Sequence, residues 1–222
     1  HWSVHPGTVP PHHQALPGGV VMRALDKEAQ ERLIEAMRSC EQAKGMNVHQ
    51  HGAMVAAYYE DLIEHLEEGE PLAYEWRLPQ WASRPEVLDV LPSRDVMHAY
   101  HVFHDCGKPF CLETDEEGRR HFPDHAAVSK RIWLEAGGDP EVGELIGMDM
   151  DAHLLKADGL EEFASRTQAR ALLLTALAEI HANAYMFGGI ESVSFKIKWK
   201  HLDKRGRQVL DLMNVAPARL SA

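Results

Sequence analysis

A histidine and an aspartate stand side by side at the end of an apolar stretch with helical spacing. Val96, Tyr100 and Phe103 recur at helical intervals before the pair His104-Asp105, and a glycine ends the pattern two residues later. Imidazole and carboxylate groups are both good ligands for divalent metal ions. The chain is therefore constrained to a fold in which other segments bring further ligands to this pair.

Four further segments place a histidine or a carboxylate in or beside a predicted helix. The helix from Asn47 to about Leu66 and the helix over 167–187 each carry one such group on an apolar face. A third group lies in the first turn of the helix that ends at Gly137, and a fourth follows the helix over 141–148. Buried imidazoles and carboxylates each need a partner, and one metal ion can serve several of them. The candidate ligands are His51, His104, Asp105, His125, Asp149 and Glu179.

The remaining elements predict an all-α protein with a β appendage. A helix is expected from Asp26 to Lys44, with Gly45 as its stop, and another begins at Ser93 as N-cap. A long connection over 67–92 is either a packed surface loop or a lid. From Val193 to Lys200 apolar residues alternate with polar ones, which predicts a strand followed by a turn and a returning strand or short helix.

These patterns divide the chain into three parts. Residues 1–21 are rich in Pro and His and are expected to form a flexible arm, 22–190 the helical core, and 191–222 a basic hairpin-like extension. From residue 195 on, the extension has seven basic residues against two acidic ones: Lys196, Lys198, Lys200, Lys204, Arg205, Arg207 and Arg219 against Asp203 and Asp211. Its lysines either face a polyanion or protect an exposed edge strand.

Composition limits the class of protein. With 222 residues the chain fits one domain, and its net charge of −11 disfavours non-specific coating of nucleic acid. No apolar run is long enough to span a bilayer, so no membrane partner is expected. Three cysteines without metal-finger spacing, and an N-terminus without a signal-like apolar core, favour a cytoplasmic location. The oligomeric state is left open, with a homodimer as one option.

Three motifs resemble the HD-domain superfamily, which is named for its His…His-Asp…Asp pattern. They are His104-Asp105-Cys106-Gly107-Lys108-Pro109, the segment 118–125 (Gly-Arg-Arg-His-Phe-Pro-Asp-His) and the helix 172–179. The likeness covers about 51–183 and is greatest to the HD domain of bacterial CCA-adding enzymes (tRNA nucleotidyltransferases). It implies an HD-domain helical bundle. The catalytic nucleotidyltransferase domain has no counterpart in this sequence, so tRNA end synthesis is not expected.

The resemblance implies a metal centre with one or two divalent ions, of Mg, Mn, Fe, Co, Ni or Zn. His51, His104, Asp105 and the last carboxylate would hold one ion, and His125 with a group on the next helix would hold a second. Two positions depart from the family pattern. Asp149 stands where a histidine is expected, with Asp151 or His153 as substitutes, and Glu179 stands where an aspartate is usual.

The expected activity is that of a metal-dependent phosphohydrolase. Its substrate would be a phosphate ester of a nucleotide or of an RNA terminus, including 2′,3′-cyclic phosphates. Asp105, Lys108 and His101 are the catalytic candidates, and Lys108, Lys130 and Arg131 the candidates for binding the phosphate. Two alternatives stay open: an HD-fold di-iron oxygenase, and a degenerate HD module that binds a nucleotide without turnover.

Overall fold

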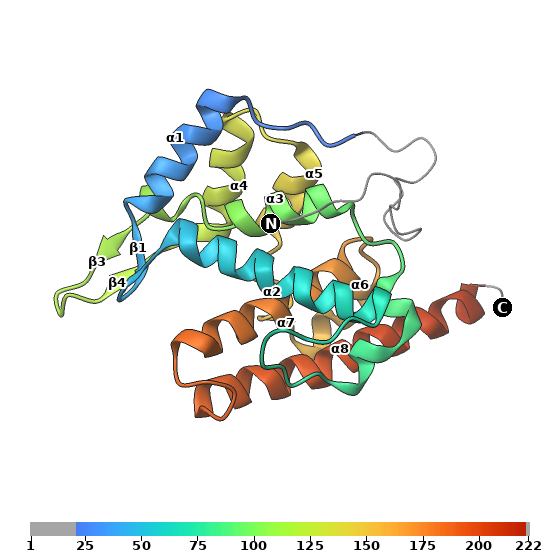
Figure 1. The fold of residues 1–222 in the computed structure, drawn as a ribbon. Coiled ribbons are helices and arrows are strands. Elements are labelled where there is room, and N and C mark those ends of the chain that lie inside the picture. Colours follow the sequence, from blue (N-terminus) through green and yellow to red (C-terminus); the bar gives the residue numbers. More distant parts are fainter. Residues whose placement is uncertain (1–20, 221–222) are drawn as a thin grey trace.

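A computed structural model describes residues 21–220, with side chains as far as residue 214. The arm predicted over 1–21 lies almost wholly outside the described residues. The described part is mostly helical, with two small antiparallel hairpins (Figure 1). The helices are α1 (Lys27–Arg38), α2 (Val48–Glu68), α3 (Arg94–Phe103), α4 (His125–Glu135), α5 (Pro140–Gly147), α6 (Leu160–Ala164), α7 (Ala169–Met186) and α8 (Val193–Leu220). The strands are β1 (Glu41–Ala43), β2 (Met46–Asn47), β3 (Glu113–Thr114) and β4 (Arg120–His121), and the short 3-10 turns are Gln80–Ser83, Pro85–Leu88, Lys108–Phe110 and Ala157–Gly159.

Helix starts follow from local capping chemistry. The Asn47 side chain accepts the Gln50 backbone N–H while the Gln50 side chain accepts the Asn47 N–H, which forms a capping box on α2. Ser93 accepts the Val96 N–H at the start of α3. Both predicted caps are confirmed. The first predicted helix is too long, because α1 ends at Arg38 and a β1–β2 hairpin turns back to α2.

Helix α2 runs through the middle of the molecule. Figure 1 shows α1, α4 and α5 on one side of it and α6, α7 and α8 on the other. The approach of α2 to α3 depends on one glycine. A Cβ at Gly52 would lie 2.3 Å from the carbonyl oxygen of Val102, so a larger residue would force the helices apart. This contact lies one residue after His51 and therefore sets how close that histidine comes to the end of α3.

The predicted C-terminal hairpin is wrong, because residues Val193–Leu220 form the single helix α8. The alternation over Val193–Lys200 does not correspond to alternate burial, since Val193 and Ile197 are 74% and 65% exposed. Its buried positions, Phe195, Leu202, Val209 and Leu210, recur at helical intervals instead. The predicted turn at 203–206 also lies inside this helix. Helix α8 therefore packs on α6 and α7 instead of forming a separate extension.

The long connection between α2 and α3 is a packed strap. The Asp61 carboxylate accepts the backbone N–H groups of Ala73 and Tyr74 and the indole N–H of Trp76. Further along, Nε2 of His181 on α7 accepts the backbone N–H of Arg77 at 3.0 Å. These bonds tie the connection to α2 and α7, in agreement with the packed-loop interpretation.

Candidate metal centre

The His-Asp pair lies in the turn that follows α3 rather than in its last helical turn. His104 is the C-cap residue of α3, and its Nδ1–H donates to the His101 carbonyl oxygen at 2.6 Å. That bond fixes the tautomer, so Nε2 is the ring atom available as a ligand. Nε2 lies 3.2 Å from Oδ2 of Asp105. Both side chains are buried, at 2% and 3% exposure.

Helix α4 is held against this turn by two bonds to Ser129, each between a backbone group and a side chain. The Gly107 N–H donates to Oγ of Ser129 at 2.9 Å, and Sγ of Cys106 lies 3.4 Å from the Ser129 carbonyl oxygen. A Cβ at Gly107 would come within 2.4 Å of the Ser129 nitrogen. The close approach brings His125, the first residue of α4, to the far side of Asp105, with Nε2 3.8 Å from Oδ1. Asp105 therefore presents one oxygen to His104 and the other to His125.

One imidazole and one ammonium group contact Oδ2 of Asp105, the oxygen that also faces His104. His51 of α2 is 5% exposed, and its Nε2 lies 3.7 Å from Oδ2 of Asp105. The Lys108 ammonium is 3.0 Å from the same oxygen and donates to Oε1 of Gln42 in β1 at 3.0 Å. Lys108 is buried, which is unusual for a lysine. Its ion pair holds the Asp105 carboxylate in position.

Two more carboxylates lie on the opposite side of His104. Asp149 follows α5 and accepts the hydroxyl of Tyr100 from α3. Glu179, in the middle of the buried helix α7, has Oε2 3.8 Å from Nε2 of His104. His153 lies beyond it, with Nε2 3.6 Å from Oε1 of Glu179. Two groups of three donors thus share His104: His51, His104 and Asp105, and His104, Asp149 and Glu179.

A cavity of about 550 Å³ contains all six predicted ligands. Lys108 and His153 line it as well. Asp151, one of the two substitutes for Asp149, does not line this cavity and pairs with Arg166 at 2.6 Å. The structure therefore favours Asp149 over Asp151, and adds His153 to the cavity.

Three predicted residues lie away from the cavity. His101 is a buried residue of α3 that contacts α7 and α2, because its Nε2 is 2.9 Å from Oγ1 of Thr175 and its ring packs on Tyr59. It acts on the site through the carbonyl group that His104 contacts. Lys130 pairs with Glu144, and Arg131 pairs with Glu135 on the surface of α4. Neither of these two residues lines the cavity, so the structure gives them no contact with a phosphate there.

The electrostatics of the buried groups are strongly perturbed. Burial lowers the pKa of His51 to about 4. Burial also disfavours the charged form of His104, but Asp105 and Asp149 outweigh it and raise its pKa to about 10. Burial would raise the pKa of Asp105, yet His104 holds it well below the ordinary value. Burial and the nearby Asp149 raise the pKa of Glu179 well above its usual range.

The donor set fits a divalent metal ion. Oε1 of Glu179 is buried and has no hydrogen-bond partner among the described residues. An unpaired buried carboxylate oxygen is costly, and so is the repulsion between Glu179 and the neighbouring Asp149. A cation between them would satisfy both, and the imidazole nitrogens of His51 and His104 supply the mixed N/O ligands that transition metals prefer.

Sequence reasoning missed part of the cavity wall. Gln42 comes from a hairpin that was predicted as helix. Ile197 and Lys198 come from the part of α8 that was predicted as strand, and His201 directly follows that part. Asn183 shared a helical face with Glu179 in the sequence, which was a usable signal for its presence. The α8 residues had no comparable signal once the segment was interpreted as a strand.

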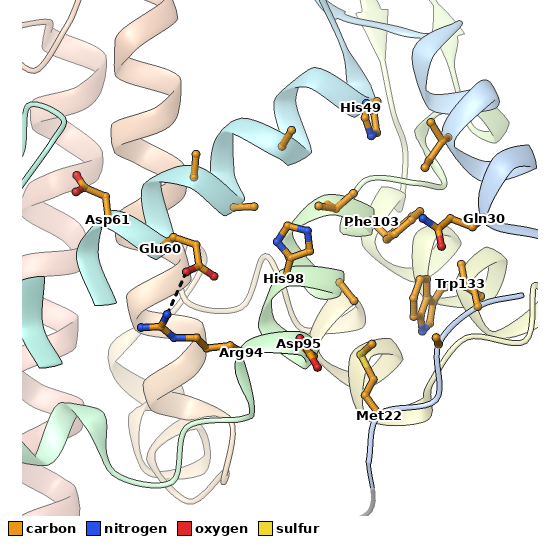
Figure 2. A pocket seen from close by; sticks show the side chains of 18 of the residues that line it. Met22, Gln30, His49, Glu60, Asp61, Arg94, Asp95, His98, Phe103 and Trp133 are labelled. Atoms are coloured by element: carbon orange, nitrogen blue, oxygen red, sulfur yellow. Dashed lines mark ion pairs between the residues drawn. The ribbon is translucent and has the colours of Figure 1, made fainter. Parts of the chain in front are cut away.

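A second cavity of about 960 Å³ is larger but shares no lining residue with the first. Figure 2 shows it between α1, α2 and α3, with the ion pair between Glu60 and Arg94 at its edge. Ala53, Ala57 and Val102 form part of its wall. None of the donor groups close enough to hold a metal lies in it, among the residues described. We therefore place the candidate site in the smaller cavity.

Comparison of the chain with protein-family models, with curated proteins and with solved structures finds no match. None of the helices within 21–220 has both the length and the apolar character needed to cross a membrane.

Proposed function

We propose that the protein is a metal-dependent phosphohydrolase that cleaves a phosphate ester of a nucleotide or RNA terminus. One observation carries the proposal: imidazoles and carboxylates from four separate segments converge, buried, in a cavity that also holds a buried lysine. The motif resemblance to HD domains agrees with this arrangement. A bound divalent ion would supply a water of lowered pKa and polarise the phosphoryl oxygens.

The protein groups divide into ligands and phosphate contacts. His51, His104 and Asp105 would hold an ion on the near side, with Glu179 and Asp149 completing its coordination. His125, which lies beside the second oxygen of Asp105, would help to hold a second ion if one binds. The number of ions and their identity belong to this proposal.

Two side chains would act on the substrate. Lys108 would stabilise negative charge on the phosphate from its buried position beside Asp105. Burial lowers the pKa of His153, so its imidazole is neutral near pH 7 and can accept a proton at Nε2 from the attacking water. His101, which was expected to be catalytic, instead orients His104 by accepting its Nδ1–H.

The test combines metal analysis with phosphate release. Purified protein is loaded in turn with Mg, Mn, Fe, Co, Ni and Zn and assayed on nucleoside monophosphates, 2′,3′-cyclic nucleotides and RNA with terminal phosphates. His104→Ala and Asp105→Ala are expected to lose bound metal and to reduce kcat by at least about 100-fold. His121→Ala is the matched control, because His121 is exposed, bonds Asp115 and does not line the cavity.

Two outcomes would overturn the proposal. Two bound irons with oxygen uptake and no phosphate release would establish the oxygenase alternative. Tight nucleotide binding without turnover under every metal would establish the degenerate binding module.

A further inference from the structure

The three lysines of the run Lys196–Lys200 would share one face of a strand, but they are distributed around the helix α8. They do not share one face of α8, because successive residues of a helix are 100° apart. Lys196 pairs with Glu191, with Nζ 3.2 Å from Oε2, and does not line the metal cavity. Lys200 does not line the cavity either, whereas Lys198 does. The cavity therefore receives one ammonium group from this run rather than a ladder of charges.

The position of α8 over the cavity is fixed by a contact to the segment after α5. Nε2 of His201 lies 2.9 Å from the Ala152 carbonyl oxygen. Leu154 of that segment and Ile197 of α8 both line the cavity, although they are 66% and 65% exposed. Large apolar side chains left exposed at the wall of a polar site suggest contact with an apolar part of a ligand.

The charges at the metal end cancel when one divalent ion is bound. As ligands, Asp105, Asp149 and Glu179 would contribute three negative charges, and the ion together with Lys108 would contribute three positive ones. Lys198 is the remaining lysine or arginine among the described residues of the cavity wall. It is thus the group that would attract an anionic substrate.

We propose that the cavity selects a single nucleotide with a terminal phosphate monoester, which narrows the hydrolase function on which this inference rests. Lys198 contacts the phosphate, Leu154 and Ile197 cover the flat base, and the amide of Asn183 offers it a donor and an acceptor. A cavity of about 550 Å³ suits one ligand of this size. An RNA backbone would need several cations along its path, and only one ammonium of the 196–200 run faces the cavity.

Calorimetric titration tests the inference without turnover. The probe is the phosphonate analogue of adenosine 5′-monophosphate, in which CH₂ replaces the bridging oxygen, added to the metal-loaded protein. Adenosine, inorganic phosphate and glycerol 3-phosphate are titrated in parallel. We expect the phosphonate to bind at least about tenfold more tightly than inorganic phosphate, because the apolar wall adds contacts.

Variants separate the two parts of the ligand. Lys198→Met is expected to weaken the phosphonate, glycerol 3-phosphate and inorganic phosphate about tenfold each, and to leave adenosine unchanged. Leu154→Ser with Ile197→Ser is expected to weaken the phosphonate about tenfold and to leave inorganic phosphate unchanged. Lys196→Met is the matched control, one exposed lysine of the same helix, and should change none of these affinities. Thermal unfolding confirms that each variant is folded.

The inference is overturned if Lys196→Met and Lys198→Met have equal effects, or if the phosphonate binds no better than inorganic phosphate. Its failure is distinct from failure of the hydrolase. Phosphate release from glycerol 3-phosphate and nucleotides at equal rates would retain the hydrolase and reject the selectivity. Selective binding of the phosphonate without phosphate release from any ester would do the reverse.

Discussion

Gly52→Ala should weaken metal binding although Gly52 is not a ligand. The added Cβ would lie 2.3 Å from the Val102 carbonyl oxygen, where an ordinary contact begins at 3.4 Å. The two helices must therefore separate by about 1 Å near this point. Since His51 precedes Gly52 directly and metal ligands tolerate errors of about 0.2 Å, the displacement moves His51 out of position. We expect a loss of metal affinity of about 10- to 100-fold, the size found when the support of a ligand is removed.

The effect on folding is smaller because two contributions oppose each other. Overpacking against the backbone of α3 costs about 1–3 kcal/mol, whereas replacing glycine by alanine inside a helix gains about 1 kcal/mol. The metal-free variant should therefore lose only about 0–2 kcal/mol of unfolding free energy by denaturant titration. Competition against a chromophoric chelator measures the metal affinity separately.

Gly143→Ala provides the matched control for this prediction. Gly143 also lies inside a helix, but its added Cβ meets the flexible side chain of Leu134 at 3.0 Å instead of a backbone group. We expect its metal affinity to be that of the unmodified protein. The reasoning is wrong if Gly52→Ala retains that affinity too, or if both variants lose it equally.

Three further predictions concern stability. Burial lowers the pKa of His181 to about 4 from an ordinary 6.5, and protonating Nε2 would break its bond from Arg77. The unfolded chain thus binds more protons, so the stability present above pH 6.5 should fall by up to about 3 kcal/mol as the pH drops toward 4. In His181→Gln, denaturant titrations at several pH values should show a flatter dependence, and an unchanged slope would refute this. Gly206→Ala should cost about 1–3 kcal/mol in the same titrations, because its Cβ would lie 2.3 Å from the Trp81 ring; unaltered stability would show that the ring can move. Glu179→Gln should lower metal affinity at least about tenfold, because a neutral amide replaces a carboxylate ligand, and should not lower the thermal midpoint of the metal-free protein, where burial and Asp149 raise the pKa of Glu179 and favour its neutral form. A lower midpoint would show that Glu179 stabilises the fold without metal.

Local chemistry made the helix boundaries near the site predictable. The residue types of Asn47 and Ser93 alone predict the helix starts, because their side chains accept hydrogen bonds from backbone N–H groups of the first turn. The helical faces also placed His51 and Glu179 inward, where the structure has them. A periodic face requires only that one side of each helix be buried, and this information is contained in the local sequence.

Structure that depends on contacts between segments far apart in the chain could not be predicted from the local sequence. The alternation at the start of α8 is too short to distinguish strand from helix, and the packing of Trp81 on Gly206 that stabilises a helix there joins segments far apart in the chain. Lys130 and Arg131, the other two predicted phosphate contacts, follow His125 by five and six residues. Five and six residues along a helix correspond to rotations of about 140° and 240°, so both point away from the site.

The geometry of the centre links metal binding to the stability of the whole fold. Its donors come from α2, the turn after α3, the segment after α5 and the middle of α7. The bond from Tyr100 to Asp149 and the contact between His101 and Thr175 already link three of these segments. Without a cation, burial and repulsion from Asp149 disfavour the charged form of Glu179 and raise its pKa, and Oε1 of Glu179 has no hydrogen-bond partner among the described residues. A bound ion would turn that repulsion into a cross-link between the two halves that flank α2. If the proposed ion binds, it would offset the cost of burying these carboxylates, and it would account for charged groups at positions where apolar residues would fold more stably.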